Sequence, residues 1–310
     1  MAVYVNTNYS ALQGQRYLGN VQNQLTTTYQ RLSSGMRINS AKDDAAGLQI
    51  ADRLTSQING LNQGNRNASD GIALAQTVES GMDEISGMLQ KIRTLAVQAT
   101  NGTNTAEDKA ALSKEASALA TEINRIANQT TFAGKKVLVG QQDDTTTIFS
   151  KSGQTNKEKA GNMTLQVGSN KGDTITFAIE NMKFSKITSR ANKAFEFGND
   201  KLANKDAAGT ITFLFSKVDP SDAIDLMDKM IADVDGQRAN LGAIQNRLES
   251  SIRNQSNVAA NEADARSRIR DADFAEESAN LSQQSIIQQA AASMLMQANT
   301  RPQLGLSLLG

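Results

Sequence analysis

Neighbouring acidic side chains are the residues of this chain that could perform chemistry. Asp43 and Asp44 form one pair, and Asp271 and Asp273 form another. Two carboxylates held together can act as general acid and base or bind a cation. The 310-residue sequence has no histidine and no cysteine, and no glycine-rich phosphate loop lies beside these acids. We therefore expect them to cap helices or to neutralise nearby arginines, and we expect a protein that is not an enzyme and holds no metal or cofactor.

The overall composition argues against several other classes of function. Lysine plus arginine balances aspartate plus glutamate at 32 each, so the net charge does not favour binding to nucleic acid or to an anionic membrane. No run of 18 apolar residues could span a membrane, and residues 1–10 lack the pattern of a cleavable secretory signal. Aromatic residues make up only 4% of the chain, which favours long helices with narrow apolar seams over a large globular core.

The longest of these seams lies between Ala45 and Thr100, with the alternating three- and four-residue spacing of a coiled coil. Its members are Ala51, Leu54, Ile58, Leu61, Ala68, Ile72, Ala75, Val78, Met82, Ile85, Leu89, Ile92, Ala96 and Ala99. At 1.5 Å per residue, the predicted helix is roughly 80 Å long. Asn65 interrupts the seam, and two shorter helices hinged between Asn59 and Asn67 are the alternative.

Glycines are unusually frequent in this predicted helix. They are Gly47, Gly60, Gly64, Gly71, Gly81 and Gly87. Each glycine weakens an isolated helix by about 0.5 to 1 kcal/mol relative to alanine. The helix therefore needs partners, and we expect the glycines to let a neighbouring helix approach closely.

A first helix is predicted before the long one. Residues 10–36 carry a second apolar stripe, and residues 31–42 break it with two serines and a glycine, so we expect an irregular connector there. Ser40, followed three residues later by Asp43, is the predicted N-cap of the long helix.

A third helix is predicted to fold back on the long one. Residues 101–105 (NGTNT) have the composition of a turn, and Thr105 with Asp108 forms a second predicted N-cap. The apolar residues that follow keep the seam spacing as far as Ile126.

Strand signals replace helix signals in the middle of the chain. Val137–Val139, Thr164–Val167, Thr174–Ile179 and Ile211–Phe215 are predicted strands. Residues 168–173 contain two glycines and are the predicted loop of a hairpin.

The last third of the chain returns to helical patterns. Asp219 and Pro220 have the residue types of a helix start, with Asp219 as N-cap. An apolar seam from Ile224 to Ile252 makes this helix the expected partner of the long one. A final amphipathic helix follows Asp273, and the chain ends in an apolar tail.

These elements predict a mainly α protein whose N- and C-terminal halves pair into a long coiled-coil rod, with a small β-hairpin region in the middle of the chain. Residues 1–42 with 268–310 are the expected terminal helical domain, residues 43–140 with 218–267 the expected rod domain, and residues 141–217 its hairpin and exposed loops. Apolar terminal helices favour contact with identical subunits, and repeated contacts that do not close make a helical filament.

Long segments of the chain resemble bacterial flagellin. They are residues 31–61 (RLSSGMRINSAKDDAAGLQIADRLTSQINGL), 89–103 (LQKIRTLAVQATNGT), 123–138 (INRIANQTTFAGKKVL), 163–179 (MTLQVGSNKGDTITFAI) and 265–299 (ARSRIRDADFAEESANLSQQSIIQQAAASMLMQAN). Little sequence separates the hairpin from Asp219, so the chain is similar to a short form with inner filament domains only.

The resemblance implies a self-assembling subunit of the extracellular flagellar filament used for swimming. The terminal helices would form an inner tube around a channel, surrounded by the rod domain. Export would use the flagellar secretion apparatus and that channel, without a cleaved signal peptide. Implied partners are other copies of the chain, a secretion chaperone, the filament cap, the hook–filament junction proteins and the flagellin-sensing Toll-like receptor, with no nucleic acid or membrane.

Three sets of candidate site residues follow. Residues expected to pack between subunits are Leu18, Val21, Leu25, Leu32, Leu281, Ile287, Met294 and Leu295. Residues that match the family's receptor-binding surface are Leu89, Gln90, Lys91, Arg93, Leu95 and Glu115, with Lys91 where many members have arginine. Residues of the polar stretch that could carry O-linked glycans are Thr145, Thr146, Thr147, Ser150, Ser152 and Thr155.

Two other functions remain open from the sequence. A hook–filament junction protein has ends that resemble those of flagellin, and a secreted monomeric adhesin or receptor ligand would also use the exposed helices. A filament subunit needs both terminal helices, whereas a monomeric ligand does not.

Overall fold

The computed structural model describes residues 7–140, 147–149, 160–192, 197–198, 202–206, 210–216 and 219–307. Within them the helices are α1 (Tyr9–Ser34), α2 (Ala45–Thr100), α3 (Ala106–Gln129), α4 (Phe184–Ala191), α5 (Ser221–Arg270) and α6 (Phe274–Ser307). The strands are β1 (Thr131–Phe132), β2 (Lys135–Lys136), β3 (Gly161–Gln166), β4 (Thr174–Ile179), β5 (Ala203–Lys205) and β6 (Ile211–Phe213). The prediction of a mainly α protein with small strand pairs mid-chain is confirmed.

The chain divides into two compact units. Unit 1 contains Met1–Asn59 and Val258–Gly310, and unit 2 contains Gly60–Asn257. The long helices α2 and α5 contribute residues to both units. No helix in the described ranges has the length and apolar character needed to cross a membrane.

Helix α2 begins and ends where its apolar seam predicts. It is helical without interruption over 56 residues, so the alternative of two helices hinged between Asn59 and Asn67 is wrong. The predicted N-cap at Ser40 is also wrong, because Asp44 Oδ1 accepts the hydrogen bond from Gly47 N at 2.9 Å. Asp43 Oδ2 instead accepts from Ser40 N in the preceding turn, at 2.9 Å, and this backbone bond lowers the pKa of Asp43.

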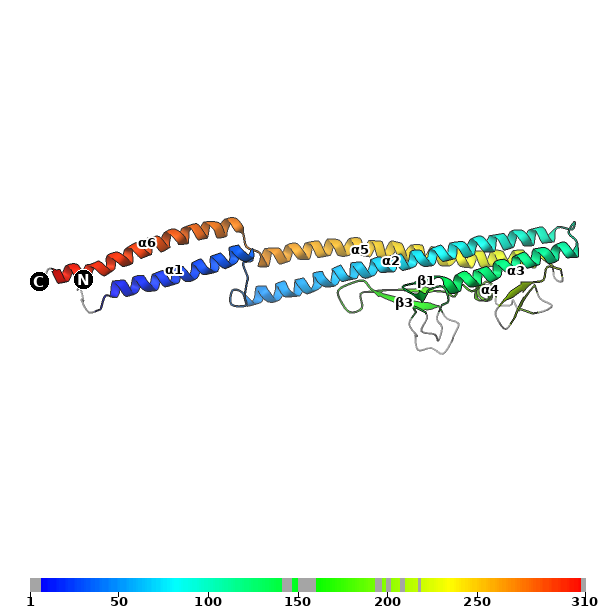
Figure 1. Ribbon diagram of the computed structural model, residues 1–310, viewed down its shortest axis with the longest axis horizontal. Coiled ribbons are helices and arrows are strands. Elements are labelled where there is room, and N and C mark those ends of the chain that lie inside the picture. Colours follow the sequence, from blue (N-terminus) through cyan, green and yellow to red (C-terminus); the bar gives the residue numbers. More distant parts are fainter. Residues whose placement is uncertain are drawn as a thin grey trace. The chain divides into compact units, whose positions relative to one another are not determined.

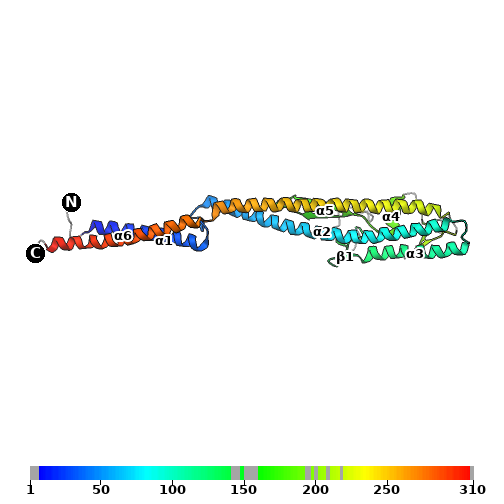
Figure 2. The same cartoon turned by 90° about the horizontal axis from the view of Figure 1, so that it is seen from above.

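Helices α2 and α5 run antiparallel in unit 2 (Figures 1 and 2). Polar contacts mark their register: Asn65 Nδ2 donates to Ser256 Oγ at 3.3 Å, Gln245 Nε2 to Glu79 Oε2 at 2.9 Å, and Arg238 Nη2 lies 3.0 Å from Asp83 Oδ1. The paired positions rise along α2 as they fall along α5, as the antiparallel arrangement requires. The apolar seam runs alongside these contacts and beyond them, and its members Val78, Ile85 and Leu89 are fully buried.

Helix α3 packs its apolar face into the same core and lies beside α2 in Figure 1. The predicted cap is confirmed as a capping box, in which Thr105 Oγ1 accepts from Asp108 N and Asp108 Oδ2 accepts from Thr105 N. The hydrogen bonds from the Thr105 side chain and backbone lower the pKa of Asp108. Local residue types therefore fix the start of this helix.

Gly64 and Gly71 face the hairpin as well as the neighbouring helix that we expect from the sequence: a Cβ on Gly64 would lie 3.1 Å from Gln255 Oε1 of α5, and one on Gly71 would lie 3.3 Å from Leu248 Cδ1 of α5. A Cβ placed on Gly64 would lie 2.2 Å from Val167 O, and one on Gly71 would lie 2.3 Å from Leu165 Cδ1. Gly60 meets Ser169 in the same way. The absence of side chains lets β3 and its loop lie directly on the helix, where Asn67 Nδ2 donates to Gln166 O at 2.9 Å.

Three antiparallel strand pairs flank the helices of unit 2. β3 pairs with β4 from Gly161↔Ile179 to Gln166↔Thr174, which confirms the predicted hairpin, although the first strand begins at Gly161 and ends at Gln166 and not at Thr164 and Val167. Val137–Val139 is not a strand: all three side chains are buried in irregular chain after β2. Burial of both faces by tertiary contacts produces an apolar run there without a strand partner.

The segment after the hairpin is held to α3 by side-chain hydroxyls. Ser117 Oγ accepts from Phe213 N at 2.9 Å, and Ser113 Oγ accepts from Phe215 N at 3.0 Å. One edge of β6 pairs with β5. The other edge is satisfied by a helix, so Phe213 and Phe215 enter the core with their backbone donors paired.

Helix α4 is attached to α5 by Arg190. Its Nη2 lies 2.7 Å from Asp233 Oδ2, and its Nη1 donates to Asn181 O at 2.7 Å. Both charged side chains are mostly buried, so the loss of Arg190 leaves Asp233 without the counter-charge of its ion pair.

We expect Arg190→Ala to lower the free energy of unfolding by about 1.5 to 3 kcal/mol, because hydrogen bonds to charged groups are lost. Chemical denaturation followed by circular dichroism measures the change. Arg190→Lys keeps the positive charge but not the planar guanidinium group, and it should retain only part of the stability that Arg190 provides. A double-mutant cycle with Asp233→Ala that gives no coupling would contradict this role.

Candidate assembly interface

Helices α1 and α6 form an antiparallel pair in unit 1 (Figures 1 and 2). Their register is fixed by polar contacts: Asn8 Nδ2 donates to Ala298 O at 2.8 Å, Gln288 Nε2 to Gln22 Oε1 at 2.6 Å, and Thr28 Oγ1 to Gln284 Oε1 at 3.1 Å. Near the end of α1 and the start of α6, Arg31 Nη1 lies 3.0 Å from Glu277 Oε1. Amide and hydroxyl groups therefore align two helices whose shared apolar seam is narrow.

The segment between α1 and α2 and the segment between α5 and α6 are hydrogen-bonded to each other. Gly35 ends α1 with a φ of 70°, a conformation that glycine adopts without strain. Arg37 N donates to Arg270 O at 2.7 Å, and Ala272 N donates to Gly35 O at 3.0 Å. Asp273 Oδ1 then accepts from Ala275 N at the start of α6. This carboxylate caps a helix, as we expect from the sequence.

The eight residues predicted to pack between subunits differ in how far they are exposed in the subunit. Val21 and Leu25 are each 4% exposed and pack within the subunit, between α1 and α6. Leu18, Leu32, Leu281, Ile287 and Leu295 are half-buried. Met294 is 61% exposed, so within this set it is the residue most available to a neighbouring molecule.

The structure adds exposed apolar residues that the seam analysis missed. They are Tyr9, Leu12, Tyr17 and Tyr29 on α1, and Phe274, Ile286 and Met296 on α6. All lie outside the seam that closes the pair. Large apolar side chains at non-seam positions of a predicted helix were the signal available in the sequence.

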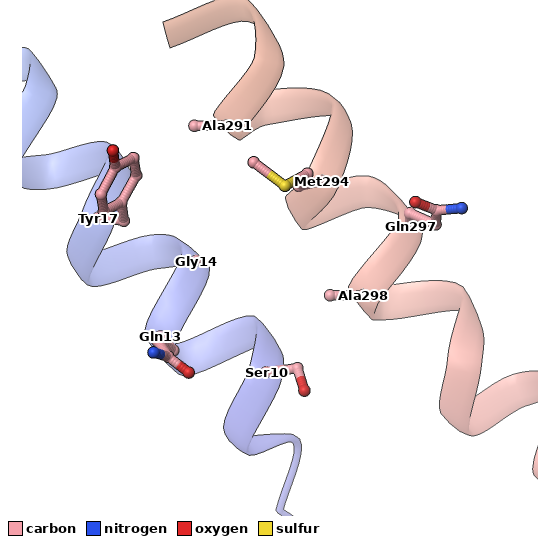
Figure 3. A pocket seen from close by; sticks show the side chains of 8 residues that line it. All are labelled: Ser10, Gln13, Gly14, Tyr17, Ala291, Met294, Gln297 and Ala298. Atoms are coloured by element: carbon pink, nitrogen blue, oxygen red, sulfur yellow. The ribbon is translucent and has the colours of Figure 1, made fainter. Parts of the chain in front are cut away.

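A groove of about 450 Å³ lies between the two helices (Figure 3). Its lining is Ser10, Gln13, Gly14 and Tyr17 from α1, and Ala291, Met294, Gln297 and Ala298 from α6. At Gly14 the two helices approach closely, since a Cβ there would lie 3.2 Å from Leu295 Cδ1. An apolar side chain of another molecule fits the chemistry of this groove better than a charged ligand.

The residues matched to the receptor-binding surface separate into buried and exposed groups in unit 2. Leu89 and Leu95 belong to the core, whereas Gln90, Lys91 and Glu115 are exposed.

Arg93, the sixth residue of this set, is engaged within the subunit. It donates from Nε to Asp228 Oδ1 at 2.6 Å and from Nη2 to Oδ2 at 3.3 Å, and this pairing raises the pKa of Arg93. The exposed members could contact a partner directly, while Arg93 would first have to break its ion pair with Asp228.

The proposed glycan-bearing stretch is mostly outside the described residues. This applies to Thr145, Thr146, Ser150, Ser152 and Thr155. Thr147 is described and is 8% exposed, so a glycan on this hydroxyl would require local opening.

Comparisons with known proteins find a family match at each end of the chain. Residues 5–143 match the model of the bacterial flagellin N-terminal helical region, and residues 224–309 match that of the bacterial flagellin C-terminal helical region. The two matches reach into both units and leave out residues 144–223 in the middle of unit 2.

Full-length relatives agree with these matches, and a solved structure shares the fold. The chain is 35% identical over 378 aligned positions to polar flagellin F of Vibrio parahaemolyticus and 36% identical over 377 to flagellin E of Vibrio cholerae, with 100% of each chain covered. A Vibrio parahaemolyticus structure assigned as a flagellar hook-associated protein shares the fold, with a TM-score of 0.55 and 19% identity over 74% of this chain and 100% of that one.

Proposed function

Since the chain belongs to the bacterial flagellin family, we propose that it polymerises through the exposed faces of its α1–α6 pair. It is a structural subunit of the flagellar filament, which lies outside the cell. The family matches carry the filament function, and the geometry of unit 1 supports the choice of surface.

The observation that best supports this choice of surface is the set of apolar side chains that lie outside the α1–α6 seam. Seven residues besides Met294 are more than half exposed there, from Leu12 at 52% to Tyr9 at 74%. Apolar side chains gathered on a folded unit favour protein–protein contact. Because the seam is already closed inside the subunit, these residues are free to contact other copies.

Seeded assembly tests the proposal. Purified full-length protein is mixed with short filament fragments, and growth is followed by sedimentation and electron microscopy. We expect the seeds to lengthen into filaments. Protein that is folded by circular dichroism yet stays in the supernatant with competent seeds would overturn it.

The junction-protein alternative is not favoured. The hook-associated neighbour is 19% identical, a level that establishes the shared fold only, whereas flagellins match the whole chain at 35–36% identity. A monomeric adhesin or receptor ligand is not favoured either. Catalysis has no place in the proposed role, which is structural.

The domain roles implied by the resemblance are part of the proposal. Residues 1–42 with 268–310 would form the inner tube, residues 43–140 with 218–267 the surrounding rod, and residues 141–217 its outer hairpin and loops. The compact units instead divide after Asn59 and before Val258, so the functional boundary at 42/43 stays a prediction. Cross-links between copies that join the rod but never the terminal helices would contradict the inner-tube role.

Export and assembly partners follow from the same family membership. We propose export by the flagellar apparatus without a cleaved signal peptide, a secretion chaperone acting on the C-terminal helix, and contacts with the cap and junction proteins. Mass spectrometry of filaments sheared from cells tests the export proposal. An N-terminal peptide that begins well after residue 2 would contradict it.

Recognition by the flagellin-sensing Toll-like receptor is a separate proposal. The exposed side chains of Gln90, Lys91 and Glu115 support it. Lysine cannot reproduce the two-pronged contact of arginine, so we expect Lys91→Arg to increase the response of receptor-expressing cells to monomer. No response at saturating monomer, for either form, would end this proposal.

O-glycosylation of the loop at 145–155 is also proposed. The polar, hydroxyl-rich composition supports it. The intact mass of protein taken from native filaments tests it, and a mass equal to that of the sequence would remove it.

A further inference from the structure

The turn between α2 and α3 contains an asparagine followed by a glycine, Asn101–Gly102. The same dipeptide occurs once more in the sequence, at Asn59–Gly60. Both asparagine residues are exposed, so water reaches both side chains. Glycine has no Cβ to hinder the approach of its nitrogen to the preceding side chain, and the backbone conformation therefore decides whether the two groups can meet.

The backbone around Asn101 leaves that approach open. Asn104 N donates to Asn101 O at 3.2 Å, but in the described part of the chain Gly102 N has no acceptor. The Asn101 Oδ1 atom accepts from Thr103 N at 3.5 Å, at the limit of a hydrogen bond. A Cβ on Gly102 would meet no atom within 4 Å, so this peptide is not packed against anything.

The second dipeptide is held in a helix. Asn59 and Gly60 lie inside α2, where each backbone N–H donates to the carbonyl four residues earlier. A Cβ on Gly60 would lie 2.7 Å from Ser169 Cβ, so the helix is also tightly covered at this point. Reaction at Asn59 would require α2 to open locally and the Ser169 contact to separate.

We propose that Asn101 is a site of spontaneous deamidation. Hydroxide removes the proton from Gly102 N, and this nitrogen attacks Cγ of Asn101. A new C–N bond forms, the bond from Cγ to Nδ2 breaks, and ammonia leaves with a proton from water. Water then adds to either carbonyl of the resulting succinimide ring and opens it to aspartate or isoaspartate. No atom is oxidised or reduced.

The product changes the charge and the length of the turn. A carboxylate at position 101 adds negative charge beside Thr100, at the carbonyl end of α2, where the helix dipole disfavours it. The isoaspartate form also carries an additional methylene in the main chain. We expect the last turn of α2 to open more often, with faster amide hydrogen exchange at residues 97–100.

Peptide mapping by mass spectrometry tests the proposal on the full-length protein. Samples are incubated at mildly alkaline pH in heavy-oxygen water, and the products are compared with time. We expect the peptide containing Asn101 to gain one heavy oxygen as it loses ammonia, at least about tenfold faster than the peptide containing Asn59.

A matched variant separates the turn chemistry from general damage. Gly102→Ala meets no steric conflict and keeps the asparagine, so the chain should fold while the reaction slows. Unfolding the protein in urea should bring the rates at Asn59 and Asn101 together. Equal rates in the folded protein, no reaction at Asn101 where the unfolded chain reacts, or an unchanged rate in Gly102→Ala would each overturn the proposal.

Discussion

Filament growth should be abolished by placing two charges on the outer face of α6. Ile286 and Met296 are 67% and 66% exposed in the subunit. In the double variant Ile286→Glu and Met296→Glu, assembly would bury carboxylates without partners, and we expect the seeded elongation rate to fall at least about a hundredfold. Sedimentation after seeding measures this loss.

The same substitutions should leave the subunit itself intact. Glutamate is a good helix former, and exposed positions usually change the free energy of unfolding by less than about 0.5 kcal/mol. The control is Ile286→Leu with Met296→Leu, which keeps both positions apolar and should elongate normally. Normal elongation by the glutamate variant would show that this face of the pair is not used.

Two glycine-to-alanine changes in α2 should have opposite effects on stability. Alanine favours a helix by about 0.5 to 1 kcal/mol over glycine, and a Cβ on Gly87 meets no atom within 4 Å. Gly87→Ala should therefore stabilise the protein by about that amount. At Gly64 the Cβ would lie 2.2 Å from Val167 O, a backbone atom that cannot move without displacing the hairpin.

We therefore expect Gly64→Ala to lower the free energy of unfolding by about 1 to 3 kcal/mol despite its better helix propensity. Urea denaturation followed by circular dichroism compares both variants with the parent chain. Hydrogen exchange should also increase in β3 and its loop for Gly64→Ala and remain unchanged for Gly87→Ala. If both variants were stabilised, the hairpin would not lie against α2 as the structure places it.

The long helices could be predicted from the sequence wherever the same spacing of apolar residues continues. The seam of α2 survives Asn65, so its ends could be predicted from the sequence, and the Thr105–Asp108 capping box depends only on residues three positions apart. The N-cap of α2 was misplaced because Ser40 and Asp43 do form a hydrogen-bonded turn, one that ends before Asp44 caps the helix at Ala45.

Tertiary contacts explain what the sequence could not show. Nothing local indicates that Gly64 will lie against the hairpin at Val167, or that Arg190 will meet Asp233. Among the described residues between 185 and 216 the elements are short, and hydroxyls on α3 satisfy part of their backbone. In unit 1 the seam residues could be identified, but their burial within the subunit, at Val21 and Leu25, depends on α6, far away in the chain.

The distribution of tyrosine gives this protein a built-in optical probe. All four tyrosines lie within the first 29 residues, and there is no tryptophan. Tyr9, Tyr17 and Tyr29 project from α1 into solvent, so near-ultraviolet emission reports on unit 1, while the phenylalanines of unit 2 contribute little. Quenching by a neutral solute such as acrylamide should therefore fall as subunits join the filament, which would follow assembly at the proposed surface without any attached label.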